Sequence, residues 1–156
     1  MKWSNTFKFK DKNIYYNRIR FGNPSERCVE ISIGFDFLAS LPSKIRILEV
    51  GNVLSHYENT LSEYIKIRNR KIIDKFESEL GVEQWDLMDM SSSEQYDAII
   101  SISTVEHIGQ GVEPSGSYGE TFLERDLEAP LKAICKIYEL LSVGGKALIT
   151  VPFGKL

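Results

Sequence analysis

The sequence predicts an α/β domain whose core is a mostly parallel β-sheet. Short apolar segments that suit buried strands alternate with segments of helical periodicity. This alternation is typical of parallel sheets joined by right-handed crossovers. Three of the strand segments also end on or just before an acidic residue, and open α/β sheets bind ligands at that edge. The expected core strands are residues 44–50, 71–74, 82–87, 96–102 and 146–152.

Length, charge and cysteine usage exclude several classes of protein. A chain of 156 residues suggests one domain that can bury a core without disulfides. The formal net charge of −3 gives no electrostatic case for nucleic acid as the main partner. No apolar run approaches the roughly 18 residues of a membrane span, and the start is too charged for a signal peptide, so we expect a cytoplasmic protein. Cys28 and Cys135 lack metal-like spacing, and we expect both as reduced thiols in the core.

Residues 1–43 are expected to form an N-terminal cap that precedes a sheet domain of residues 44–156. The alternation over 6–10, the turn-like residues that follow and the apolar residues 14–16 predict a small hairpin. Its basic and aromatic side chains form either a solvated face or a cap that helps to hold an anionic acceptor. Pro42 ends the next segment.

The helical segments differ in how clearly the pattern defines them. Period-2 alternation over 28–37 fits a strand, but we prefer a short helix over about 33–41. A second helix is expected over 59–68, with Asn59 or Thr60 as its cap, and at most a turn or two over 77–80. The clearest helix is 126–141, because one apolar stripe runs along it. The stripe comprises Leu127, Leu131, Ile134, Cys135, Tyr138 and Leu141.

Three consecutive strand segments are followed or closed by acids, namely Glu49, Asp74 and Asp86. Parallel strands bring such ends to the same edge of a sheet. Carboxylates accept hydrogen bonds from hydroxyl and amine donors but repel a pyrophosphate. The pattern therefore favours a nucleoside ligand without phosphates, of which S-adenosylmethionine is the common example.

Taken together, the motifs make the chain resemble a class I S-adenosylmethionine-dependent methyltransferase of the type 11-like group. The matching segments are 48–52, 73–74, 85–90, 96–108 and 140–152. The resemblance implies a Rossmann-like, doubly wound, mostly parallel sheet of strand order 3-2-1-4-5, here preceded by a hairpin and helix extension. It also implies that S-adenosyl-L-methionine is the cofactor. We expect no metal site.

The resemblance assigns roles to individual residues. Glu49 would face the methionine end of the cofactor through water or the ammonium group, and Gly51 and Asn52 would let the backbone approach it. Asp74 would accept from the ribose hydroxyls. Asp86, or its rival Asp89, would accept from the adenine amino group. The remaining expected contacts are Leu87 near the adenine ring and Ser101 and Ser103 below the methionine part.

The chain departs from the family pattern in two ways. Val53 and Ser55 stand where the first motif usually has further glycines. The family fold also continues beyond the fifth strand with a helix and an antiparallel hairpin, whereas this chain stops at Leu156. We therefore expect either a fragment or a minimal version, whose exposed sheet edge could support a homodimer.

His107 is the candidate catalytic base, because an oxygen acceptor must lose a proton during methyl transfer. Its alternative role is structural, as it is for His56 in the first loop. Glu113 and Tyr118 lie in a glycine-rich segment, 109–119, that is long enough to be functional. They either touch the acceptor or are solvated.

The predicted function is methyl transfer to an unidentified acceptor, such as a sugar or another small molecule. An inactive nucleoside-binding fragment is the first alternative. The second, less favoured alternative is an NAD(P)-binding oxidoreductase, but the turn at Gly51 lacks the Gly-x-Gly-x-x-Gly pattern.

Overall fold

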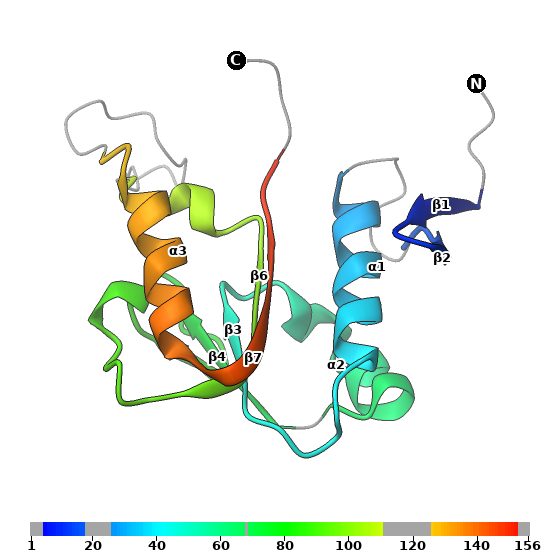
Figure 1. The fold of residues 1–156 in the computed structure, drawn as a ribbon, viewed down its shortest axis with the longest axis horizontal. Helices are drawn as coiled ribbons and strands as arrows, with labels where there is room; N and C mark the ends of the chain where they lie inside the picture. Colours follow the sequence, from blue (N-terminus) through cyan, green and yellow to red (C-terminus); the bar gives the residue numbers. More distant parts are fainter. Residues whose placement is uncertain (1–4, 18–25, 68, 111–125, 153–156) are drawn as a thin grey trace. The chain divides into compact units, whose positions relative to one another are not determined.

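The computed structural model describes residues 5–17, 26–67, 69–110 and 126–152 (Figure 1). The chain divides into two compact units. One consists of Met1–Lys44 and Leu54–Arg68, and the other of Ile45–Val53 and Asn69–Leu156. The second unit contains the acids that follow the strands, and hence the candidate site. The proposed division into a cap of 1–43 and a domain of 44–156 stays a prediction.

The second unit is built on a five-stranded parallel sheet in the order β5-β4-β3-β6-β7. Numbered along the core strands alone, this is the predicted order 3-2-1-4-5, so the Rossmann-like arrangement is confirmed. The strands are β3 (Ile47–Val50), β4 (Arg70–Asp74), β5 (Val82–Gln84), β6 (Tyr96–Ile102) and β7 (Leu141–Thr150).

The core of this unit lies between one face of the sheet and helix α3 (Ala129–Leu140) (Figure 1). Alternate residues of β3, such as Leu48 and Val50, pack with residues of β4, β6 and α3 in one apolar cluster. Pro130 fits the first turn of the helix, where its missing N–H has no intrahelical partner. Burying this face supplies most of the stability that such a helix needs.

The helix exists as predicted, but the predicted apolar stripe is not its buried face. The buried residues are instead Ala129, Ala133, Ile137 and Leu140, which also recur at helical spacing. Of the predicted stripe, Leu131 is 65% exposed and Tyr138 is 78% exposed. Cys135 is exposed as well, so the expectation that both thiols lie in the core holds only for Cys28. The small side chains of Ala129 and Ala133 allow the helix to pack closely on the sheet. Comparing the hydrophobicity of the two helix faces does not reveal this advantage.

The connection from β4 to β5 contains no helix. The turn or two predicted over 77–80 is replaced by an irregular segment that ends in a turn at Gly81, whose φ is +88°. Without a helix, this connection runs directly from the end of one strand to the start of the next. Its side chains consequently lie beside the carboxyl ends of β3 and β4, as the contacts of Asn52 with Glu77 show.

The first unit combines a hairpin with helical segments. Strands β1 (Thr6–Phe9) and β2 (Lys12–Tyr15) pair antiparallel, as predicted. The helix preferred over a strand is present as α1 (Glu26–Ala39), but it begins seven residues earlier than expected. Its buried stripe of Cys28, Ile31 and Leu38 has helical spacing and extends the helix toward the N-terminus.

The predicted helix over 59–68 is a helical run of mixed geometry. It consists of a 3₁₀ turn η1 (Leu54–Tyr57), a single α-turn α2 (Glu58–Thr60) and a π-helical turn η2 (Leu61–Ile65). No side chain caps α2 or η2, so the caps expected at Asn59 or Thr60 are not formed. The run ends where Lys66 adopts a left-handed conformation, with φ of 65°.

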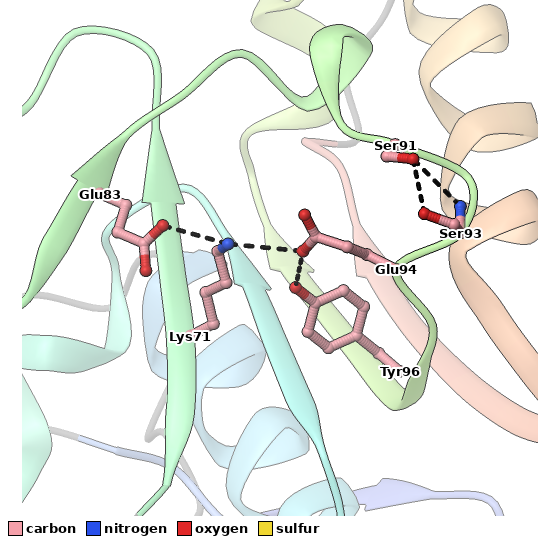
Figure 2. A network of polar contacts seen from close by, with 6 residues as sticks. All are labelled: Lys71, Glu83, Ser91, Ser93, Glu94 and Tyr96. Carbon is pink, nitrogen blue, oxygen red and sulfur yellow. Dashed lines mark hydrogen bonds and ion pairs between the residues drawn. The ribbon is translucent and has the colours of Figure 1, made fainter.

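A polar network lies across the sheet in the second unit (Figure 2). Lys71 Nζ on β4 is 3.1 Å from Glu83 Oε2 on β5 and 3.5 Å from Glu94 Oε2. The hydroxyl of Tyr96, the first residue of β6, donates to the same Glu94 oxygen at 2.9 Å. Because β3 lies between β4 and β6, these side chains connect strands that are not neighbours.

The network changes the acid–base properties of its members. Burial and the hydrogen bond to Glu94 raise the pKa of Tyr96 to about 12. Burial alone would lower the pKa of Lys71, but the hydrogen bond to Glu83 and the nearby Tyr96 and Glu94 outweigh it and raise that pKa. Both groups are therefore protonated at neutral pH.

Among the described residues, no helix has the length and apolar character to cross a membrane.

Candidate functional site

The candidate site lies at the carboxyl ends of β3, β4 and β5, where the sequence predicted three acids to meet. Asp74 is the last residue of β4, Glu49 is the third residue of β3, and Asp86 follows β5. In the parallel register Glu49 pairs with Ile72, two residues before Asp74. Side chains alternate along a strand, so Glu49 and Asp74 share one face of the sheet.

Glu49 is paired inside the protein. Its Oε2 is 2.6 Å from Arg70 Nε, and its Oε1 accepts the Val53 N–H at 3.0 Å. The Glu49 and Arg70 side chains are only 2% and 3% exposed. The carboxylate therefore fixes the turn after β3 and has its charge balanced by the guanidinium. Whether it also faces the methionine end of a cofactor stays a prediction.

Gly51 makes the sharp turn that the sequence predicted. Its φ is +87°, and its N–H donates to the carbonyl of Ile73 at 2.8 Å. A Cβ at this position would overlap the side chain of Thr104, with Cγ2 at 2.7 Å and Cβ at 2.8 Å. Only glycine satisfies both the backbone conformation and this close approach. The turn after β3 thus packs directly against the residue that follows β6.

Asp74 organises the segment after its own strand. Its Oδ1 accepts the backbone N–H groups of Phe76 and Glu77 at 2.9 and 3.0 Å, and its Oδ2 accepts the N–H of Asn52 at 3.3 Å. A carboxylate offers about four lone-pair positions, so acceptor capacity remains for a hydroxyl donor. The role that the resemblance assigned to Asp74 stays a prediction.

Asn52 is buried beside Asp74. Its side-chain Nδ2 donates to Glu77 Oε2 at 2.7 Å and approaches Glu79 Oε2 at 3.4 Å. Its Oδ1 is buried and has no hydrogen-bond partner within the part of the chain that the structure describes. The turn therefore presents a buried acceptor at the predicted ligand-binding edge.

Asp86 caps the short 3₁₀ turn η3 (Leu87–Asp89). Its Oδ1 accepts the Met88 N–H at 2.9 Å, and its Oδ2 is 2.9 Å from Lys75 Nζ. Partial burial alone would raise the pKa of Asp86, but Lys75 and the Met88 N–H outweigh it and lower that pKa. Its rival Asp89 is exposed, and Leu87 belongs to the apolar core.

The two serines of β6 and its following turn occupy different environments. Ser101 is fully buried, and its hydroxyl has no partner among the described residues. Ser103 adopts a positive φ of 43°, and its N–H donates to the Thr150 carbonyl at 3.0 Å. Most buried polar atoms of folded proteins have a hydrogen-bond partner, so the Ser101 hydroxyl is an exception.

His107 ends the 3₁₀ turn η4 (Val105–His107), which follows β6 after Ser103 and Thr104. The ring atom Nε2 is 3.8 Å from Glu106 Oε1. The backbone N–H of His107 donates to the Thr104 carbonyl at 2.9 Å. The histidine therefore belongs to the same edge of the sheet as Gly51. His56 is exposed in the first unit, and Glu113 and Tyr118 lie outside the described residues.

Sequence reasoning missed four residues that lie against the predicted site residues, namely Arg70, Lys75, Glu77 and Thr104. Arg70 directly precedes the predicted second strand, and a basic residue one position before a buried strand was the available signal. Lys75 directly follows Asp74, and Glu77 begins the segment 77–80 for which a turn or two of helix was expected. No group of three or more metal-ligating acids, histidines or cysteines occurs within the described ranges.

Solved structures of other proteins include chains that are similar to this one. Neither a protein-family model nor a curated protein matches the sequence. Among solved structures, the chain is similar to a coclaurine N-methyltransferase bound to N-methylheliamine and SAH, with a TM-score of 0.46 and 17% identity. The match covers 79% of this chain and 36% of that chain.

Proposed function

We propose that the second unit binds S-adenosylmethionine and that the protein is a methyltransferase acting on a small molecule. The observation that carries the proposal is the edge formed by three adjacent parallel strands. Asp74 ends β4, Asp86 comes after β5, and the Gly51–Asn52 turn follows β3. This is the position at which open α/β sheets bind their ligands.

The residues present fit a nucleoside better than a dinucleotide. Asp74 retains acceptor capacity, and Asn52 Oδ1 is a buried acceptor without a partner in the described structure. Ribose hydroxyls are donors that suit both. A pyrophosphate would instead meet the carboxylates of Asp74, Glu77 and Asp86 at this edge, and like charges at close range repel.

In this proposal Asp74 holds the ribose, and Asp86 accepts from the adenine amino group. Lys75 already occupies one oxygen of Asp86, so the amino group would share this carboxylate with the lysine or displace it. The cofactor supplies an activated methyl group on a sulfonium, and the protein orients it toward the acceptor. His107 stands after β6 as the candidate base for an oxygen acceptor.

Isothermal titration calorimetry tests the proposal directly. The full chain is titrated with S-adenosylhomocysteine and, separately, with NAD. We expect micromolar binding of S-adenosylhomocysteine and no binding of NAD. NAD binding alone would favour the oxidoreductase alternative, and binding of neither ligand by a folded sample would refute the cofactor site.

A further inference from the structure

Asn52 is held by two acidic side chains from another segment of the second unit. The residue is only 7% exposed, and its Nδ2 is 2.7 Å from Glu77 Oε2 and 3.4 Å from Glu79 Oε2. Glu77 and Glu79 are both exposed and follow β4. The shorter distance identifies Glu77 as the main partner of the amide.

These contacts determine which way the amide points. Ionised carboxylates only accept hydrogen bonds, so the Asn52 side chain must present its NH₂ group to Glu77 and Glu79. The amide oxygen is then directed away from them. In the described part of the chain this oxygen is buried without a partner, although almost all buried polar atoms of folded proteins have one.

The position of Asn52 indicates which ligand group would meet this oxygen. The backbone N–H of Asn52 donates to Asp74 Oδ2 at 3.3 Å, which places the residue next to the acid that would hold the ribose. Ser101, in contrast, pairs with Val50 on the face opposite to Glu49 and Asp74. Asn52 therefore belongs to the part of the edge where the sugar would lie.

We propose that Glu77 is a positioning residue that orients the Asn52 amide so that Asn52 Oδ1 accepts a hydrogen bond from a ribose hydroxyl. This inference rests on the proposed function. Glu77 does not touch the ligand in this arrangement, and it acts only through Asn52. Asp74 and Glu77, three positions apart, thus have different roles. Asp74 accepts from the ligand, and Glu77 orients the second acceptor, Asn52 Oδ1.

The test compares two ligands that share the adenosyl group. S-Adenosylhomocysteine carries the amino-acid part, and 5′-methylthioadenosine lacks it. Binding of both is measured by calorimetry for the wild type, Glu77→Ala, Glu77→Gln, Asn52→Ala and the double variant Asn52→Ala/Glu77→Ala. Glu128→Ala is the matched control, because Glu128 is an exposed glutamate of the same unit at the start of α3.

We expect Glu77→Ala and Asn52→Ala each to weaken binding of both ligands by about fivefold, the effect of one lost hydrogen bond. Glu77→Gln should stay within about twofold of the wild type, because its amide oxygen still accepts from Asn52 Nδ2. The double variant should bind no more weakly than Asn52→Ala, since Glu77 acts through that residue. Glu128→Ala should bind like the wild type.

A ligand-free measurement checks the contact itself. In ¹⁵N-labelled protein, the side-chain amide resonances of Asn52 should shift in Glu77→Ala and stay in place in Glu128→Ala. Unchanged resonances in Glu77→Ala would overturn the inference without any ligand. This readout also separates loss of the contact from a general failure to fold.

The binding outcomes distinguish the inference from the proposed function. A wild type that binds neither ligand would refute both. Wild-type affinity for both ligands in Glu77→Ala would overturn the inference and leave the cofactor site standing. A loss confined to S-adenosylhomocysteine would place Asn52 at the amino-acid part and contradict the assignment to ribose.

Discussion

Arg70 and Glu49 form a buried ion pair between neighbouring strands, with Nε and Oε2 2.6 Å apart. Glu49 lies two residues before Gly51 on β3, and its carboxylate also accepts the Val53 N–H. Removing one partner takes a counter-charge away from the other group in a buried environment. The arrangement therefore couples the stability of the sheet to the shape of the turn at Gly51.

Breaking this ion pair should be costly. We expect Glu49→Gln or Arg70→Met to lower the free energy of unfolding by about 3–5 kcal/mol, because each removes one charge of a buried ion pair. The double variant Glu49→Leu/Arg70→Met should be more stable than either single variant. Urea unfolding measures all three, and a loss below about 1 kcal/mol in both single variants would contradict a buried pair.

The contact between Gly51 and Thr104 can be separated from backbone strain. Gly51 and Gly81 have nearly the same φ, +87° and +88°, but a Cβ at Gly81 would meet nothing within 4 Å. Gly81→Ala should therefore cost only the left-handed conformation, about 1–2 kcal/mol. Gly51→Ala should cost more because of Thr104, as judged by urea unfolding. Equal losses in the two variants would show that Thr104 does not restrict position 51.

Tyr96 predicts how stability changes in alkali. Its pKa is raised to about 12 in the folded protein, whereas an unfolded tyrosine titrates near 10. The unfolded state loses this proton first, so stability should fall as the pH rises from about 10 to 12. The raised pKa of Lys71 acts in the same direction. Tyr96→Phe should flatten the decline in urea midpoints over this range, and an unchanged slope would contradict the assignment.

Ser101 offers a prediction that separates folding from binding. Its hydroxyl is buried without a partner among the described residues, so Ser101→Ala should not destabilise the free protein. If the hydroxyl faces the ligand, the same variant should weaken binding of S-adenosylhomocysteine by about fivefold. Destabilisation of the free protein by more than about 1 kcal/mol would instead assign the hydroxyl a structural partner.

The sheet could be predicted from the sequence because its signals are local. Strand β6 is a nearly continuous apolar run. Glu49 near the end of β3 and Gly51 directly after that strand mark the turn. Strand order followed from the resemblance to a family rather than from the residues themselves. Helix α3 was located correctly because one full apolar stripe is enough to define its period.

The sequence predictions were wrong or incomplete where one local pattern is compatible with more than one packing arrangement. Helix α3 carries two apolar stripes, and the sequence did not show that the smaller side chains of Ala129 and Ala133 face the sheet. The Arg70–Glu49 pair and the Asn52–Glu77 contact join residues more than 20 positions apart. Such contacts depend on strand register and on the path of the segment after β4, which no local periodicity specifies.

The central claim is that Asp74, at the end of β4, holds the ribose of an adenosyl ligand. Calorimetric titration of S-adenosylhomocysteine into the wild type, Asp74→Ala and the control Glu128→Ala tests this most directly. The account predicts micromolar binding by the wild type and Glu128→Ala, and at least about tenfold weaker binding by a folded Asp74→Ala, since hydrogen bonds to charged groups are the stronger ones. Equal affinity of Asp74→Ala and the wild type would contradict it.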